Sequence, residues 1–164
     1  AFRTGDFGAQ IKALDRSFRA VEDNLLSCTL WNYTEDNTNA RGDGWNGEDF
    51  SIFSRDQQDE PGDMDSGGRA LRAIVRPYGR AIAGEPLRLS FDMRRRVFEF
   101  EFRHDPAVTC PTEIFVPHLQ YGQGFRVEVS DGSVEIDRPR QLVIYRHDAG
   151  LGEHWVRITP AGAY

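Results

Sequence analysis

Residues 87–103 read LRLSFDMRRRVFEFEFR and hold two runs in which apolar and polar side chains alternate. The alternate apolar positions are Leu87, Leu89, Phe91 and Met93 in the first run, and Phe98, Phe100 and Phe102 in the second. Successive side chains of a β-strand point to opposite faces, so each run predicts a strand with one apolar face. These runs decide the fold class of the second half of the chain.

The chain after Pro86 continues in the same pattern. Further strands are predicted at residues 112–116, 125–130, 141–146 and 155–159, and turn signals such as Ser130-Asp131-Gly132 separate them. Short strands at this spacing, each with one apolar face, predict an antiparallel β-sandwich over residues 86–164.

The first half of the chain has a different pattern. Apolar side chains recur at steps of four, three, four and three at Phe7, Ile11, Leu14, Phe18 and Val21. This spacing predicts a one-faced helix that ends near residue 23. Residues 25–33 form an apolar run without alternation, which predicts a strand covered on both faces, and residues 70–75 predict a second helix that ends before Pro77. The fold class is therefore an α+β chain in two parts, an α/β segment followed by the sandwich.

Length and charge exclude several classes of protein. With 164 residues the chain is too short for a complete eight-stranded α/β barrel, which needs about 250. The net charge of −6 offers no basic excess for nucleic acid, and no apolar run reaches the roughly 20 residues of a membrane span. The start at Ala1 lacks an initiator Met and an apolar signal core, so we expect it to lie in the middle of a longer protein.

The acidic, aromatic segment after Trp31 is the candidate functional region. Residues 1–85 carry a net charge of −5 and residues 86–164 only −1. Sugars present an apolar face and a rim of hydroxyls, so they bind flat aromatic rings beside carboxylates and amides. Residues 30–49 supply both kinds of group. The alternative is a structured loop whose aromatic rings are buried for packing and whose Asn and Asp side chains make turns.

The same segment also allows two other interpretations, a calcium-binding loop and a hydrolytic pair of carboxylates. Asn37, Gly42 and Glu48 have the spacing of a calcium-binding loop, but Asn37 replaces the usual first Asp and Arg41 sets a cation where an oxygen ligand belongs. We therefore expect no metal and no cofactor. The local carboxylates are Glu35, Asp36, Glu48 and Asp49. A hydrolytic pair needs a shaped pocket that one loop rarely supplies, so these carboxylates are expected to bind hydroxyls or cap turns.

The spacing of the cysteines and histidines predicts no disulfide scaffold and no metal site. Cys28 and Cys110 allow at most one disulfide, and buried free thiols are expected. The four histidines, His104, His118, His147 and His154, lie in the sandwich half without a close metal-ligand spacing. We expect them to be exposed or to have ordinary hydrogen-bond partners.

The chain resembles a known family in several motifs. These are RTGDF at 3–7, QIKALDRS at 10–17, LWNYTEDNTN at 30–39, GDGWNGED at 42–49, RPY at 76–78 and PTEIFVP at 111–117. They look like the C-terminal part of glycoside hydrolase family 5 enzymes of the glucosylceramidase and endoglycoceramidase type. The resemblance covers nearly the whole chain, and the tryptophan-rich segment is its specific part.

The resemblance implies a fold and a division of the chain. Family members are retaining enzymes on a (β/α)8 barrel, so residues 1–80 would be the terminal segment of that barrel and residues 86–164 its C-terminal β-sandwich domain. Residues 25–33 would be the eighth strand. Both catalytic glutamates would lie upstream of Ala1. Trp31 would be the platform under the sugar, and the substrate rim would include Asn37, Trp45, Asn46, Glu48 and Asp49.

The expected function is that of the C-terminal portion of a retaining β-glycosidase, which hydrolyses a glycolipid such as glucosylceramide or a related β-glucoside. The expected partners are that substrate and the missing N-terminal barrel portion, with no nucleic acid; the chain has no transmembrane segment but allows peripheral membrane contact. One alternative is a non-catalytic sugar- or lipid-binding sandwich that uses exposed aromatics such as Tyr121 and Phe125. A third is a sandwich with a purely structural role.

Overall fold

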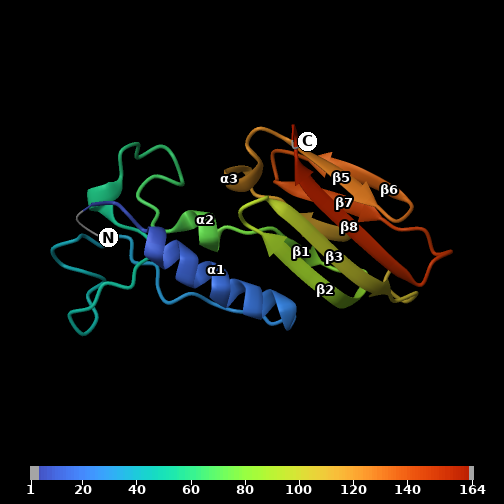
Figure 1. The fold of residues 1–164 in the computed structure, drawn as a ribbon, viewed down its shortest axis with the longest axis horizontal. Helices are drawn as coiled ribbons and strands as arrows, with labels where there is room; N and C mark the ends of the chain where they lie inside the picture. Colours follow the sequence, from blue (N-terminus) through green and yellow to red (C-terminus); the bar gives the residue numbers. More distant parts are fainter. Residues whose placement is uncertain (1–3, 163–164) are drawn as a thin grey trace. The chain divides into compact units, whose positions relative to one another are not determined.

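The computed structural model describes residues 4–162, and they divide into two compact units (Figure 1). The first unit comprises the chain up to Ser17 together with Ser27–Ile74. The second comprises Phe18–Leu26 and the chain from Val75 onward. None of the helices in residues 4–162 is both long enough and apolar enough to cross a membrane.

The second unit contains an antiparallel sandwich of two four-stranded sheets, as predicted, but the sandwich begins at residue 78 and not at residue 86. The first sheet has the order β1-β4-β7-β6, formed by β1 (Tyr78–Ala81), β4 (Thr112–Phe115), β7 (Leu142–Arg146) and β6 (Ser133–Asp137). The second has the order β2-β3-β8-β5, formed by β2 (Gly84–Asp92), β3 (Val97–His104), β8 (Glu153–Pro160) and β5 (Phe125–Val129). Of these strands, β1 and β6 were not predicted. The four residues of β1 show no alternation, whereas β6 (SVEID) does alternate, with Val134 and Ile136 at its apolar positions, and was overlooked. A four-residue helix, α3 (His118–Tyr121), follows β4.

Alternate residues of the central strands form the sandwich core. Phe98, Phe100 and Phe102 of β3 are at most 1% exposed and pack with Val143 and Tyr145 of β7, in the other sheet. Full burial of one such side chain contributes about 1.5–3 kcal/mol. The alternation that predicts these strands is thus the pattern of the core itself.

Arginine and glutamate side chains pair across the outer face of the β2-β3-β8-β5 sheet. Arg88 of β2 bonds Glu101 at 2.9 Å and Glu99 at 3.1 Å. Arg103 of β3 bonds Glu85 at 3.0 Å and Glu153 at 2.9 Å. We call these pairs the outer-face ion pairs. They are solvent-exposed, so each contributes only about 0–1 kcal/mol to stability.

The predicted N-terminal helix is confirmed as α1 (Gly8–Asp23). The Asp6 carboxylate accepts a hydrogen bond from the Gly8 backbone N–H at 2.9 Å, and so caps a free amide at the start of the helix. At the other end, Leu25 adopts a φ of 52°, and the Leu26 N–H returns to the carbonyl of Val21 at 2.9 Å. This left-handed residue closes the helix in the way a C-terminal cap does.

The predicted strand at residues 25–33 is wrong for this chain. The segment forms no β-strand in the structure, and Leu26 and Trp31 are 63% and 67% exposed. A strand exists only when a neighbouring backbone completes its hydrogen bonds. Among the described residues, Asn32 bonds the backbone of Phe50 and Ile52, and no ladder extends from there.

The remaining expectations for the first half have mixed outcomes. The second helix is present but shorter than predicted, as α2 (Leu71–Ile74), and a single 3-10 turn, η1 (Arg55–Gln57), was not predicted. The expectation of buried cysteines is wrong, since Cys28 and Cys110 are both free and exposed. Each lies in a segment outside the regular elements, where no packed layer covers it.

Candidate functional site

Residues 30–68, which we call the tryptophan-rich loop, contain no regular element except η1. The part of this loop that holds Trp31 and Trp45 is organised around the carboxylate of Asp43. This carboxylate accepts hydrogen bonds from the backbone N–H of Phe50 at 3.1 Å, the backbone N–H of Trp45 at 3.0 Å and the Asn32 side-chain amide at 3.0 Å. The bond from Phe50 is the main cause that lowers the pKa of Asp43 below 3.8, and burial opposes it. One ionised side chain therefore joins the residue after Trp31 to the turn that carries Trp45.

The far part of the loop is held by the buried guanidinium of Arg69. Arg69 is 3% exposed and donates to Asp49 at 2.6 Å, Asn39 at 2.9 Å and Gln57 at 2.8 Å. It also donates to the carbonyl of Ser51 at 3.1 Å. A planar group with five donors can satisfy several acceptors at once, so Arg69 fixes parts of the loop that are far apart in sequence.

Trp31 and Trp45 lie side by side at the surface of this loop. Their ring centroids are 6.3 Å apart and their planes meet at 71°. Trp31 is 67% exposed and Trp45 is 58% exposed. An edge-to-face pair of this kind holds each ring in place while leaving one face free, so the loop offers an exposed aromatic platform.

The other predicted site residues fall into two groups. Asn46 and Glu48 are exposed, and they follow Trp45 in a turn in which Asn46 has a φ of 47°. Asp49 is engaged by Arg69, and Asn37 is fully buried, with its amide donating to the carbonyl of Phe53 at 2.8 Å. The structure thus brings Asn46 and Glu48 to the surface near Trp45, and sets Asn37 and Asp49 inside the loop.

A close approach inside this turn requires glycine at position 42. Gly42 has a φ of 71°, and a Cβ built on it would lie 2.3 Å from the carbonyl oxygen of Glu48. The Gly42 N–H bonds the Thr38 carbonyl at 2.8 Å, and the Asp43 N–H bonds the Glu48 carbonyl at 3.2 Å. This backbone closure sets the position of residues 45–48.

The loop carboxylates differ in how far they are engaged. Asp36 pairs with Arg41, whereas the Glu48 carboxylate has no hydrogen-bond or ion-pair partner among residues 4–162. A free carboxylate beside an aromatic platform can accept hydrogen bonds from two vicinal hydroxyls. Chemically, this surface can bind a polyhydroxylated ring.

Asp43 and Arg69 are the site residues that sequence reasoning missed. Asp43 carries a recognisable signal, because an Asp whose side chain bonds the backbone N–H two residues on is a common turn former, and here it bonds Trp45. Arg69 carries no comparable signal, since its partners at Asn39, Asp49 and Gln57 are 30, 20 and 12 residues away.

The aromatics proposed for a binding sandwich do not form a surface. Tyr121 is 2% exposed, and its ring packs edge-to-face on Phe125, with centroids 5.6 Å apart. Burial raises the pKa of the Tyr121 hydroxyl well above its ordinary value. The expectation that Tyr121 is exposed for ligand recognition is therefore wrong.

Comparison with known proteins gives a family match over half of the chain. Residues 76–158 match the glycoside hydrolase family 5 C-terminal domain. A glucosylceramidase of Rhizopus delemar is 33% identical over 162 residues, which cover 90% of this chain and 24% of that protein.

Two solved structures share the fold. Sterylglucosidase 1 of Cryptococcus neoformans superposes with a TM-score of 0.87 at 31% identity, over 98% of this chain and 25% of that one. Endo-glycoceramidase II from Rhodococcus sp. superposes with a TM-score of 0.66 at 22% identity, over 93% and 30% of the two chains, and at this identity the likeness concerns the fold alone. The chain spans about a quarter of the length of the glucosylceramidase and the sterylglucosidase.

Proposed function

The chain belongs to the glycoside hydrolase family 5 C-terminal domain family, and from this membership we propose that it is the C-terminal portion of a retaining β-glycosidase. The substrate class is a β-glucoside with a lipid aglycone. Its relatives include a glucosylceramidase and a sterylglucosidase, whose names denote hydrolysis of a glucoside of ceramide and of a sterol.

The exposed Trp31–Trp45 pair is the observation that carries the proposal. Two large aromatic rings more than half exposed are costly in water, because they leave apolar area unburied. A sugar ring can cover such a platform with its C–H face. We assign Trp31 the role of platform, and Trp45 the role of its neighbour at the rim.

Polar contacts to the sugar fall to the exposed residues beside Trp45. In the proposed site Asn46 and Glu48 bond hydroxyls, because both side chains are exposed and Glu48 is unengaged within the described chain. Asn37 and Asp49 act from inside the loop. Asn37 supports Phe53 and Asp49 neutralises Arg69, so both preserve the position of the rim.

In this proposal the two catalytic carboxyl groups come from outside the chain. A retaining glycosidase needs two carboxyl groups about 5–5.5 Å apart on opposite sides of the bond that breaks. Among the loop carboxylates, Asp36, Asp43 and Asp49 are engaged in turns and ion pairs, whereas those of Glu35 and Glu48 have no partner within the described residues. The acid/base and the nucleophile are therefore assigned to a barrel portion that precedes residue 1 in the complete protein.

The test compares the chain of residues 1–164 with the product of its complete reading frame. A fluorogenic β-glucoside, glucosylceramide and a sterol glucoside are offered to each. We expect hydrolysis by the complete product and none by the chain alone. Turnover by the chain alone would overturn the assignment of catalysis elsewhere, and a complete, folded product that hydrolyses none of the three substrates would overturn the function.

A further inference from the structure

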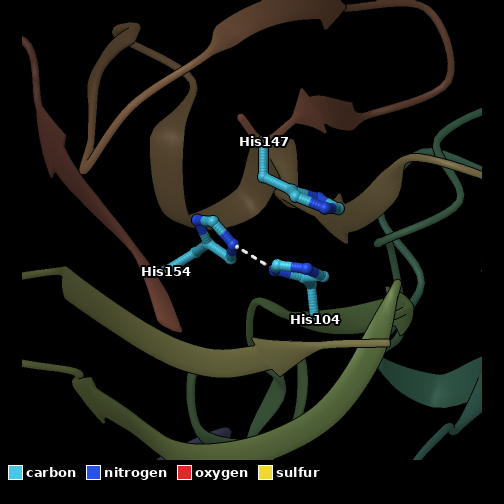
Figure 2. Close-up of side chains that lie close together, drawn as sticks. All are labelled: His104, His147 and His154. Carbon is cyan, nitrogen blue, oxygen red and sulfur yellow. Dashed lines mark hydrogen bonds between the residues drawn. The ribbon is translucent and has the colours of Figure 1, made fainter. Parts of the chain in front are cut away.

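Three histidines converge at one end of the sandwich, although they are far apart in sequence. His104 is the last residue of β3, His154 lies in β8, and His147 follows the end of β7. The ring centroid of His147 lies 4.8 Å from that of His104 and 4.5 Å from that of His154. Figure 2 shows the three rings turned toward one another, with one hydrogen bond between them. Because β7 belongs to one sheet and β3 and β8 to the other, the cluster bridges the two layers.

The hydrogen bonds of His154 determine which of its ring nitrogens is the donor. Its Nδ1 lies 2.8 Å from a carboxylate oxygen of Asp131. Asp131 also accepts bonds from the Asp148 N–H at 2.6 Å and the Ser130 hydroxyl at 2.7 Å. An ionised carboxylate only accepts, so His154 donates from Nδ1 and directs the lone pair of Nε2 into the cluster.

A carboxylate that orients a buried histidine is the usual outer partner of a metal-binding imidazole. Such a carboxylate selects the tautomer, fixes the ring and increases the basicity of the other nitrogen. His154 is 1% exposed, so its Nε2 faces protein groups. The atom nearest to it in the cluster is Nδ1 of His104, at 2.9 Å.

His147 supplies a nitrogen that the protein leaves unsatisfied. Its Nδ1 is buried and has no hydrogen-bond partner among the described residues. A buried polar atom without a partner costs about 1–3 kcal/mol. This nitrogen is therefore available for a bond to a metal ion.

From these contacts we propose that His104, His147 and His154 bind one Zn²⁺ ion. One ring nitrogen from each lies within 4.8 Å of the other two. Tetrahedral zinc with Zn–N bonds of about 2.0–2.1 Å needs its nitrogens about 3.3 Å apart. The rings of His104 and His147 stack with their planes at 22°, so zinc binding requires rotation of these side chains to aim one nitrogen of each at the ion. Zinc then replaces the hydrogen bond between His104 and His154.

The fourth position of the zinc faces an open pocket. A pocket of about 400 Å³ is lined by His104, His147 and Cys110, among others. It gives the ion an entry path and leaves room for a water molecule as the fourth ligand. Three histidines and one exchangeable position are a ligand set that zinc commonly takes.

Bound zinc links the two sheets of the sandwich. The ion ties β3 and β8 to the chain after β7, and a metal that binds only the folded state raises its stability. This inference concerns the second unit and does not depend on the glycosidase proposal. Loss of activity and loss of zinc are separate measurements.

The test uses the untagged full chain, stripped with a chelator and dialysed. Zinc is titrated by calorimetry, and bound metal is counted by mass spectrometry after gel filtration. We expect one Zn²⁺ per chain and a higher unfolding temperature with zinc. His147→Asn should weaken binding by about 100-fold through the lost ligand, and Asp131→Asn by about 10–100-fold through His154.

His118→Asn is the matched control. His118 is the fourth histidine of the chain and is exposed outside the cluster, so this variant should bind zinc as the wild type does. Circular dichroism establishes that each variant is folded. His147 is only half-buried, so its replacement leaves the core in place. Zinc bound well below one ion per chain in the wild type, or equal binding by folded His147→Asn, overturns the proposal.

Discussion

Arg76 and Glu22 form a buried, two-point ion pair between residues 54 positions apart in the chain. Nε of Arg76 lies 2.5 Å from one oxygen of Glu22, and Nη2 lies 2.8 Å from the other. The guanidinium also donates to the carbonyl of Phe91 at 3.0 Å and lies 4.9 Å from the centroid of the Phe91 ring. The pair therefore connects the last turn of α1 to the sandwich within the second unit.

Removal of one partner of this pair should strongly destabilise the fold. Glu22→Gln keeps the shape of the side chain but leaves the Arg76 charge buried without its counter-ion, and we expect a loss of about 3–5 kcal/mol. Urea unfolding followed by circular dichroism measures the change. Glu128→Gln is the control, because Glu128 pairs with Arg157 at 3.9 Å on the exposed face, and its loss should cost at most about 0.5 kcal/mol. Equal effects of the two variants would contradict the assigned role of Arg76.

Trp31→Ala should reduce the activity of the complete glycosidase without unfolding it. Trp31 is 67% exposed, so its truncation leaves no buried cavity in the chain, while the sugar platform is lost. We expect kcat/KM for a β-glucoside to fall by about tenfold or more, equivalent to about 1.4 kcal/mol. Trp155→Ala is matched in residue type and is 44% exposed on the sandwich. If the two variants have the same kinetics, Trp31 does not contact the sugar.

The reactivity of Cys28 should depend on the barrel portion that we propose to precede residue 1. Both cysteines are free and exposed here, so a thiol reagent should modify both in the native chain. In the complete product we expect the proposed barrel to cover the stretch around Cys28, while Trp31 stays open to the sugar, and Cys28 should react at least about tenfold more slowly. Cys110 is the internal control, and its rate should be the same in both proteins. An unprotected Cys28 would argue against burial of this stretch by a preceding barrel portion.

Acid should loosen the tryptophan-rich loop through Asp43. Its folded-state pKa is below the ordinary 3.8, so ionised Asp43 contributes stability above about pH 4, and that contribution is lost as the pH falls through the folded-state pKa. In a Trp155→Phe background, the emission of Trp31 and Trp45 should change in acid. Asp43→Asn should show the acid-type emission already at neutral pH. Asp59→Asn, which alters an exposed carboxylate of the same loop, should titrate like the background protein.

The sandwich could be predicted because the information for it is local. Phe98, Phe100 and Phe102 alternate with charged residues, and the same residues are buried in the core. The segment at residues 25–33 shows the limit of this reasoning. Its apolar run indicates burial on both faces, but burial depends on neighbouring strands, and in residues 4–162 it has none.

The candidate site could be predicted in composition but not in arrangement. The aromatic and acidic residues after Trp31 indicate a sugar-binding surface, and that remains a prediction. The pairing of Trp31 with Trp45 depends on Asp43, which nothing in the sequence links to Asn32. Long-range contacts of this kind do not appear in a local pattern.

The two-residue period of the strands predicts the position of two of the clustered histidines. His104 continues the inward positions of Phe100 and Phe102 along β3, and His154 lies two residues before the inward Val156 along β8. Extending the two-residue period by one step would have set both rings inside the sandwich. The approach of His147 from the other sheet could not be found in this way, because it depends on how the sheets stack.

The outer-face ion pairs also select the correct alignment of neighbouring strands. In the observed register Arg103 stands opposite Glu153 and Glu99 opposite Arg157. Shifting β3 by two residues in one direction keeps the phenylalanines inside but sets Glu101 opposite Glu153, so like charges meet. Pairs that add little to equilibrium stability can therefore discriminate against misaligned intermediates during folding, and high salt, which screens them, should increase the misfolded fraction on refolding.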